Sequence, residues 1–592
     1  MVLEKSEFRR KEEFNGVMIL SMRKTSIKVE YEDAKTGDSG PADFERAITA
    51  TGYGKFNYLL LLAVLPGSFS SIFSSSVMSY VLPSAECDLQ LTMFDKGLLN
   101  SMTFAGGMIS TVFFWGCMAD TFGRKKLMFY GYLITGLLSL ATCFSHTSWL
   151  LITFKFFDGV IIAGPYAALM SYLAELHDEV HRSRSYMWLG VFFSLGNISL
   201  PCIAWLILPQ NWDVTLFNQT IEINSWRVFL AICSLPEFLA CAALYAFPES
   251  PRFLILKGRY DEALNVFKKI YSLNTGKDPD TYPIKSLKNE YSVESSGERI
   301  QDKMRSCLKQ MKPLFLPPNI FKLILISTIQ LGATLGSNSL RLWMPQLFAM
   351  IESYKNTVMK NDNHVSGLQS SFCYMLGQEK LHLNSTRYIN ETINNDAVAC
   401  VPMEMNSQVF INSIVIAITS VIGYTLGGTL ITVVGKKKLM AICFIVAAIS
   451  CGSLYWAEDT NSILGLSSVF VAMSSIGGAT VTNIIVDNFP TCLRTMAVSI
   501  TMMMGRIGAV IGNLLFPILF NLSCLGPFIM IGSACLVQIL HFNLTVRARF
   551  LVGLLRSCAI LELAFTSSPT YNVPVSIQQW WSLVGLERSD VM

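Results

Sequence analysis

The chain has 592 residues, of which 52% are hydrophobic and only 15% are charged, whereas about 25% of the residues of a soluble domain are charged. So few charged residues cannot cover the surface of a soluble protein of this size, and the composition therefore indicates a multi-span membrane protein. The formal net charge of +4 is too small to indicate a nucleic-acid-binding protein.

The first segment, residues 1–55, is polar and carries charges of both signs. Its longest apolar run, "GVMIL", is too short to cross a bilayer. We expect a cytoplasmic N-terminal tail, followed by a first span that acts as a signal anchor.

Apolar stretches of about 20 residues, the length that crosses a bilayer, recur along the rest of the chain. Twelve stretches qualify as candidate spans: 56–82, 98–118, 127–146, 149–173, 186–208, 228–247, 320–345, 408–432, 438–456, 462–485, 497–521 and 525–545. We therefore predict an all-α membrane protein with twelve transmembrane helices. The 248–319 segment is a long cytoplasmic linker in this scheme, and residues 546–592 are a cytoplasmic tail.

The distribution of Lys and Arg predicts the orientation of these spans. Basic residues follow spans 2, 4, 8 and 10 and are frequent in the linker, whereas the opposite loops carry acidic residues. Since basic loops stay in the cytoplasm, both termini are predicted to be cytoplasmic.

Three glycosylation sequons fall on the predicted outer side, at Asn218, Asn384 and Asn390. The last two lie in a polar outer loop, residues 346–406, which also contains Cys373 and Cys400. An oxidising compartment would favour a disulfide between these cysteines, and two free thiols are the alternative. The sequence contains no CxxC pair and no histidine cluster, so we predict no metal site and no cofactor.

Two stretches repeat at one offset. "GCMADTFGRKKLM" begins at Gly116 and "GTLITVVGKKKLM" begins at Gly428, 312 residues later; Glu175 and Arg182 match Asp487 and Arg494 at the same offset. This predicts two parallel, pseudo-symmetric six-helix halves, residues 56–247 and 320–545.

The first of these stretches resembles the loop signature G-x-x-x-D-x-x-G-R-K of the major facilitator superfamily. "PESPRFL" (248–254) and "DNFPTCLRT" (487–495) resemble motifs of its sugar and organic-ion porters. "VLPSAECDLQLTMFDKGLL", "SYLAELHDEVHRSRSYMW" and "PESPRFLILKGRYDEAL" are similar to the synaptic vesicle glycoprotein 2 family and its insect relatives. The resemblance covers residues 50–545 and implies the major facilitator fold.

The resemblance also implies a cytoplasmic gate. The residues that match its motifs are Gly116, Asp120, Gly123, Arg124, Glu175, Arg182, Arg252, Asp487 and Arg494. We expect Asp120 and Arg124 to lock the two halves together when the inner gate is closed, although a purely topological role of the basic run is the alternative. Thr432 replaces the acid in the second copy, so any lock there is weaker.

Ionisable residues within spans are costly and commonly face a cavity. We identify Lys155, Asp158, Glu237 and Arg506 as candidates, together with Ser71 and Ser75 on a hydroxyl-bearing face of span 1. The alternatives are a static ion pair between Lys155 and Asp158, which are three residues apart, snorkelling of Arg506 to the cytoplasmic surface and small-residue helix packing of the serines. Span 1 has no acid, unlike related proton-coupled porters, so we expect no proton relay between helices 1 and 4.

These features favour a transporter that moves a small organic solute, organic-ion-like or sugar-like, by alternating access. A chain without a P-loop is not expected to use ATP, and no nucleophile and base suggest an enzyme. The alternative is a non-transporting vesicle membrane glycoprotein with a trafficking, regulatory or receptor role. We expect the plasma membrane or an intracellular vesicle membrane as its location, and the lipid bilayer and vesicle proteins as partners.

Overall fold

The computed structural model describes residues 41–111, 114–210, 214–216, 221–288, 312–361, 371–378, 406–489 and 491–539. The chain forms two compact units, Met1–Val537 and Gln538–Met592. The first unit contains every element discussed below apart from the end of the last helix. The predicted tail 546–592 and three predicted glycosylation sites, Asn218, Asn384 and Asn390, lie outside the described residues.

The N-terminal half consists of helices and one short hairpin. Its helices are α3 (Lys55–Ser76), α4 (Met78–Ala85), α5 (Met93–Thr111), α6 (Phe114–Phe122), α7 (Arg124–Thr142), α8 (Ser148–Glu175), α9 (Glu179–Ile207), α10 (Ser225–Cys233) and α11 (Leu235–Tyr245). Between α9 and α10, β1 (Val214–Leu216) pairs antiparallel with β2 (Ile221–Ile223), with Val214 opposite Ile223.

The C-terminal half is built from longer, less interrupted helices. They are α15 (Asn319–Asn361), α17 (Ser407–Val434), α18 (Lys436–Ser453), α19 (Thr460–Asn488) and α20 (Thr491–Leu522), followed by a shorter apolar helix, Leu525–Ile539. The 3-10 turn η3 (Leu454–Trp456) ends α18. The described residues therefore confirm an all-helical membrane protein, apart from the one hairpin.

Nine helical segments of the described residues are long and apolar enough to cross a membrane. Helices also occupy the other three predicted spans, namely α5 with α6, α7, and Leu525–Ile539. That these three also cross the membrane stays a prediction. Span 6 is divided at Ser234, where α10 ends and α11 begins. Pro236 lies in the first turn of α11, a position that favours proline.

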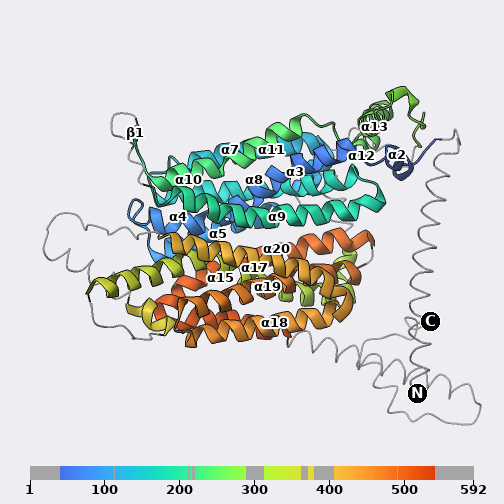
Figure 1. Cartoon of the computed structure of the whole chain (residues 1–592). Helices are drawn as coiled ribbons and strands as arrows, with labels where there is room; N and C mark the ends of the chain where they lie inside the picture. Colours follow the sequence, from blue (N-terminus) through green and yellow to red (C-terminus); the bar gives the residue numbers. More distant parts are fainter. Residues whose placement is uncertain are drawn as a thin grey trace, which may run out of the picture. The chain divides into compact units, whose positions relative to one another are not determined.

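The two halves lie side by side (Figure 1), with α3 to α11 above α15 to α20 in this view. Among the described residues, the closest contacts between the halves are those of α5 with α20, α9 with α17, and α4 with α15. Within the N-terminal half, α5 and α8 approach closely through Gly106 and Gly159. A Cβ on Gly159 would overlap the carbonyl oxygen of Thr103, so the missing side chains are what permit this approach.

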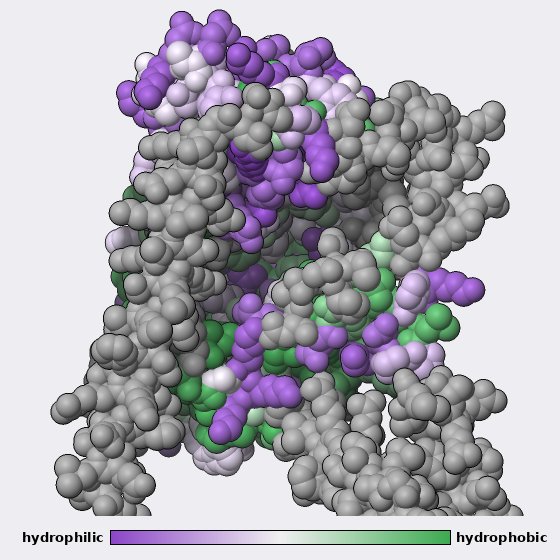
Figure 2. Space-filling model, turned by 90° about the vertical axis from the view of Figure 1, so that its right-hand side faces the viewer, coloured by the Kyte–Doolittle hydropathy of each residue, from purple (hydrophilic) through white to green (hydrophobic). Residues whose placement is uncertain are grey.

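Short helices of the linker gather at one end of the molecule (Figure 1). They are α12 (Pro251–Leu256), α13 (Tyr260–Thr275) and the 3-10 turns η1 (Pro279–Thr281) and η2 (Lys312–Phe315). Ala263, Phe267 and Ile270 form the buried face of α13, so this helix is amphipathic. Hydrophilic residues cover α12, α13 and their surroundings at the top of this face (Figure 2), as expected for a segment in contact with the cytoplasm.

Part of the predicted N-terminal tail also belongs to this linker cluster. Helix α2 (Phe44–Ala50) lies within residues 1–55 and buries Ala47 and Ile48 against α12 and α13. Ala42 forms an isolated parallel bridge with Leu287. The end predicted to face the cytoplasm therefore combines the chain just before span 1 with the linker that follows span 6.

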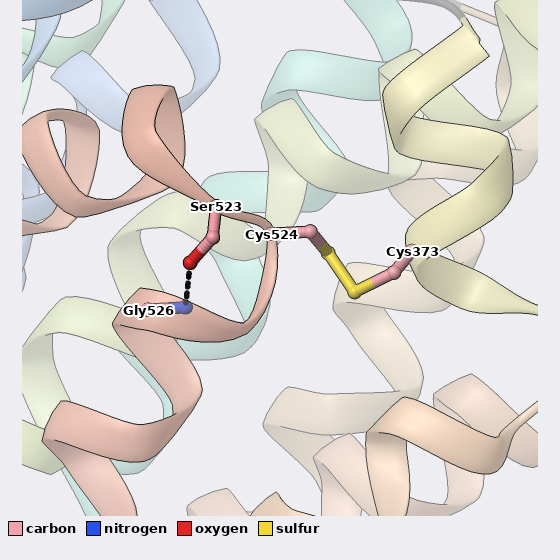
Figure 3. Close-up of a disulfide and its surroundings, with 4 residues drawn as sticks. All are labelled: Cys373, Ser523, Cys524 and Gly526. Atoms are coloured by element: carbon pink, nitrogen blue, oxygen red, sulfur yellow. Dashed lines mark hydrogen bonds between the residues drawn. A yellow bond between two sulfur atoms is a disulfide. The ribbon is translucent and has the colours of Figure 1, made fainter.

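The predicted disulfide between Cys373 and Cys400 is wrong. Cys373 instead pairs with Cys524, with 5.6 Å between their Cα atoms, and Cys400 lies outside the described residues. Figure 3 shows Cys524 in the turn after α20, where the Ser523 hydroxyl accepts a hydrogen bond from the Gly526 N–H. The outer loop is thus tied to the helix ends of its own half rather than closed on itself.

Candidate functional site

A central cavity of about 430 Å³ lies between the two halves. The N-terminal half contributes residues of α3, α4 and α9, and the C-terminal half contributes residues of α15, α17, α19 and α20. Such a volume suits a small-molecule site, since ligand pockets range from about 300 to 1,000 Å³.

Hydroxyl and amide side chains line much of this cavity. They are Ser76, Ser79, Tyr80, Asn197, Gln330, Thr334, Ser337, Asn338, Ser413, Ser420, Tyr424, Ser474, Ser475 and Thr482. Apolar residues, among them Phe193, Leu342 and Met502, complete the wall. A polar wall inside an apolar helix bundle can hydrogen-bond a hydrophilic solute that the bilayer itself would exclude.

One face of α15 supplies the largest continuous part of this wall. Gln330, Thr334, Asn338 and Arg341 follow one another at intervals of four, four and three residues, which places them on one side of a helix. The Thr334 hydroxyl donates to the Gly505 carbonyl of α20 at 2.6 Å. This bond fixes the face against its neighbouring helix.

Arg341 is the only charged residue among the described residues that line the cavity. Its Nη1 donates to Oδ1 of Asn197 at 3.0 Å and its Nη2 to Oδ1 of Asn338 at 3.1 Å. Asn197 belongs to α9 of the other half, so this guanidinium lies where the two halves meet.

Lys155 and Asp158, two of the predicted cavity residues, form an ion pair inside the N-terminal half, which is the alternative considered for them. Nζ of Lys155 lies 3.0 Å from Oδ2 of Asp158, and both side chains are almost completely buried. The Ser74 hydroxyl of α3 donates to the same carboxylate oxygen at 2.8 Å. The pair therefore joins α8 to α3, and neither residue lines the central cavity.

Glu237 is buried near this ion pair. It belongs to α11 and is 1% exposed, and its Oε2 accepts no hydrogen bond from a described residue. It packs beside Gly136 of α7, whose Cβ would lie 3.1 Å from Cβ of Glu237. Glu237 is thus separated from the central cavity, in the interior of the N-terminal half.

The other predicted cavity residues also lie outside this lining. The Arg506 guanidinium of α20 lies against Gly107 of α5, in the space that a side chain at Gly107 would fill. Ser75 donates to the carbonyls of Ser71 and Ile72 in its own helix, at 3.1 and 3.0 Å. Arg506 therefore contributes to packing between the halves.

The gating motifs meet at the cytoplasmic end of the N-terminal half. Nη2 of Arg124 lies 3.3 Å from Oε1 of Glu175, and the Ser250 hydroxyl donates to Oε2 of Glu175. Glu249 accepts from the backbone N–H of Lys125 at 2.9 Å. Gly123 has a φ of 94°, a conformation that favours glycine, and it allows the turn from α6 to α7.

Arg182 and Arg252 connect these motifs to the linker cluster. Arg182 donates to Glu45 of α2 at 2.8 and 3.1 Å, and the Arg252 guanidinium lies 5.9 Å from the centre of the Phe44 ring. Gly116 and Asp120 lie in α6, Asp487 in α19 and Arg494 in α20, and their contacts fall outside what the structure describes. In the described part, the motif therefore binds α2, α8 and α12 of one half together.

Sequence reasoning overlooked two cations, one partly buried and one fully buried. Arg341 lies within predicted span 320–345, so a charge inside a span was a signal that could have identified it. Lys96, fully buried and 2.6 Å from Glu86, lies just before predicted span 98–118, where no pattern in the sequence indicates burial.

At the end predicted to face outside, the halves pack directly on each other. Phe410 of α17 is fully buried in a cluster of the N-terminal half that includes Ile72 and Phe73. Met93 of α5 packs conversely against the core of the C-terminal half. These contacts close the bundle beyond the cavity, and β1 lies at this end, opposite α12 and α13 (Figure 1).

Comparisons with known proteins agree with this architecture. Residues 63–360, half of the chain, match the family "Sugar (and other) transporter", and residues 404–553 match "Major Facilitator Superfamily". Synaptic vesicle glycoprotein 2B of Rattus norvegicus is 22% identical over 574 residues, covering 83% of this chain and 84% of the relative. Synaptic vesicle glycoprotein 2C of Homo sapiens is 28% identical over 301 residues, covering 48% and 41%.

Solved structures show the same fold at low sequence identity. The partially occluded inward-open structure of the xylose transporter XylE from E. coli has a TM-score of 0.56 at 13% identity, and the match covers 82% of this chain and 98% of that one. The inward-open structure of the same transporter has a TM-score of 0.53. With family matches across both halves and this shared fold, the chain is a multi-pass integral membrane protein that belongs to the major facilitator superfamily, a family of transporters and not of enzymes.

Proposed function

We propose that this protein moves a small organic solute across a membrane by alternating access, with the solute bound in the central cavity. The observation that carries the proposal is the polar cavity of about 430 Å³ between the halves. Superfamily members bind substrate at such an interface and expose it to each side by rocking the halves. The matching family, described as "Sugar (and other) transporter", supports a solute of the size of a sugar.

The packing of the outer end supports this mechanism. Phe410 and Met93 hold the halves together at the outer end. Opening the outer end requires the Phe410 contacts to separate. We propose that the cytoplasmic ends of the halves then approach each other.

A second candidate is a non-transporting glycoprotein of a vesicle membrane, with a trafficking, regulatory or receptor role. The observation that favours it is the similarity to synaptic vesicle glycoproteins 2B and 2C, together with a first span, α3, that carries no acidic residue. On either candidate we propose the plasma membrane or an intracellular vesicle membrane as the location, with glycans at Asn218, Asn384 and Asn390 facing the lumen or exterior.

Counterflow in proteoliposomes separates the two candidates. Vesicles containing the purified chain are preloaded with one unlabelled solute and tested for uptake of the same labelled solute, across neutral sugars, organic anions and organic cations. A transporter gives saturable uptake that the internal solute stimulates, with or without a proton gradient. Absence of stimulated uptake across the whole panel, in protein that is folded and correctly inserted, would favour the non-transporting candidate.

Replacing Arg124 by glutamine is expected to weaken the state in which the outer end is open, because the cytoplasmic lock loses its cation. Disulfide crosslinking between cysteines at the cytoplasmic ends of α6 and α20 reports this state, and we expect its yield to fall several-fold. Lys437→Gln, in the exposed basic run of the second repeat, is the matched control and should change little. Equal crosslinking in the Arg124→Gln variant and the parent would argue against a gate role.

A further inference from the structure

The charge of the central cavity is not balanced by any described residue of its wall. Arg341 is the single charged residue among the described lining residues, and it donates hydrogen bonds to the neutral amide oxygens of Asn197 and Asn338. A cation at this depth is costly unless it is paired. The cavity therefore carries a positive charge without a matching carboxylate.

Three buried cations elsewhere in the described residues each have a carboxylate partner. Lys96, Arg124 and Lys155 are each less than 9% exposed, and they pair with Glu86, Glu175 and Asp158 at 2.6, 3.3 and 3.0 Å. Among the described residues no carboxylate lies within such reach of Arg341. Arg341 is partly exposed and lines the cavity, so a bound anion can supply the counter-charge that the described residues do not.

We infer that the solute of the central cavity is an organic anion whose carboxylate binds Arg341. A guanidinium carries five N–H donors in a planar fork that matches a carboxylate. Two of these donors hold Asn197 and Asn338, which orients the fork and leaves donors for the ligand. The inference deepens the proposed function and rests on it, because it assigns a substrate class to the same cavity.

The rest of the wall indicates what the anion carries besides its carboxylate. Gln330 is 5% exposed, lines the cavity, and its Oε1 accepts no hydrogen bond from a described residue. Ser337 lies between Gln330 and Arg341 on the cavity face of α15. A buried acceptor and several hydroxyl groups suit a solute with its own hydroxyl or N–H groups. The inferred class is therefore a small carboxylic acid with a polar body.

The position of Arg341 also predicts how such an anion affects the transport cycle. Arg341 belongs to α15 of the C-terminal half, and its partner Asn197 belongs to α9 of the N-terminal half. A carboxylate bound to Arg341 either competes with the Asn197 amide for the guanidinium or bridges the two side chains. Anion binding is therefore coupled to the relative position of the two halves, as alternating access requires.

Binding to the purified full-length chain in detergent tests the inference with matched pairs of probes. The pairs are gluconate with glucose, lactate with lactamide, and nicotinate with nicotinamide, and choline serves as a cationic probe. Sodium chloride keeps the ionic strength equal. We expect at least one carboxylate to raise the melting temperature saturably, and its neutral partner to need at least a tenfold higher concentration for the same shift.

Variants at Arg341 assign the effect to this side chain. In Arg341→Gln the carboxylate should lose at least tenfold in apparent affinity, because a charge-assisted pair is lost. Arg341→Lys should retain part of the affinity, since it keeps the charge but not the planar fork. Arg259→Gln removes an exposed arginine, whose side chain is 53% exposed, outside the cavity, and is the matched control that should bind like the parent.

The outcomes separate the inference from the proposed function. A carboxylate-specific shift that Arg341→Gln abolishes supports the inference, even where counterflow of that probe is slow. Equal shifts by both members of every pair, a carboxylate shift that survives Arg341→Gln, or no carboxylate shift across the panel would each overturn it. Counterflow of glucose or choline that is unaffected by Arg341→Gln would overturn it as well, while leaving the proposed transport intact.

Discussion

Replacing Lys155 by methionine is expected to lower the free energy of unfolding by about 3–5 kcal/mol, the usual cost of removing one partner of a buried ion pair. Lys155 is 1% exposed and Asp158 is fully buried, so water cannot take over the lost interaction. The variant keeps one hydrogen bond to the carboxylate, from Ser74 at 2.8 Å. A single neutral donor cannot offset a buried negative charge.

A second substitution at Asp158 separates charge from packing. The double variant Lys155→Met with Asp158→Leu removes both charges, and replacement of a whole buried pair by apolar groups is often neutral or stabilising. We therefore expect it to recover most of the loss. Unfolding of the purified chain in mixed micelles, followed by helical circular dichroism, measures the free energy of each variant.

The chain also offers a matched exposed pair. Arg259 and Glu262 have the same spacing of three residues, but their side chains are 53% and 52% exposed. Arg259→Met is expected to cost no more than about 1 kcal/mol, because water screens the pair. A loss in Lys155→Met as small as that in Arg259→Met, or a double variant no more stable than the single one, would contradict a stabilising role of the buried pair.

Local patterns in the sequence predicted local structure well. Lys155 and Asp158 share a helical face at a separation of three residues, and that spacing alone led to the observed pair. Hydropathy located helices at all twelve predicted spans because an apolar run of this length has few alternatives to a membrane helix.

Contacts between distant segments could not be predicted from such patterns. Cys373 pairs with Cys524 across a sequence separation of 151 residues, and nothing in the spacing of the cysteines distinguishes this partner from Cys400. The cavity wall depends in the same way on how α9 and α15 cross. Asn197 is an unremarkable polar residue in the sequence, and only the fold places its amide against Arg341.

The candidate cavity residues illustrate the same limit. A charge within a span indicates an inward-facing side chain, and Lys155, Asp158 and Glu237 do face the interior. The pattern does not tell whether that interior is the cavity between the halves or the packed core of one half. For these three residues it is the core of the N-terminal half, since none of them lines the cavity.

Replacing Gly159 by alanine adds one methyl group. Among substitutions that add a single methyl group to this chain, we expect it to be one of the most destabilising. A Cβ at Gly159 would overlap the backbone carbonyl of Thr103 in α5, and a Cβ at Gly106 would overlap the carbonyl of Phe156 in α8. Backbone atoms cannot rotate away as a side chain can, so the two helices must separate. Such overpacking costs about 1–3 kcal/mol and sometimes more, and α5 also contacts α20 of the other half.

Gly190 provides the matched control for this change. It lies within α9, and a Cβ there meets no atom within 4 Å. Gly190→Ala is therefore expected to leave stability unchanged or to raise it by up to about 1 kcal/mol, the difference in helix propensity between the two residues. Since Gly159→Ala gains the same propensity, the difference between the two variants isolates the steric cost of the α5–α8 contact. The melting temperature of each variant is measured as the temperature at which heating removes the monodisperse protein. If Gly159→Ala is as stable as Gly190→Ala, α5 and α8 do not need their close approach.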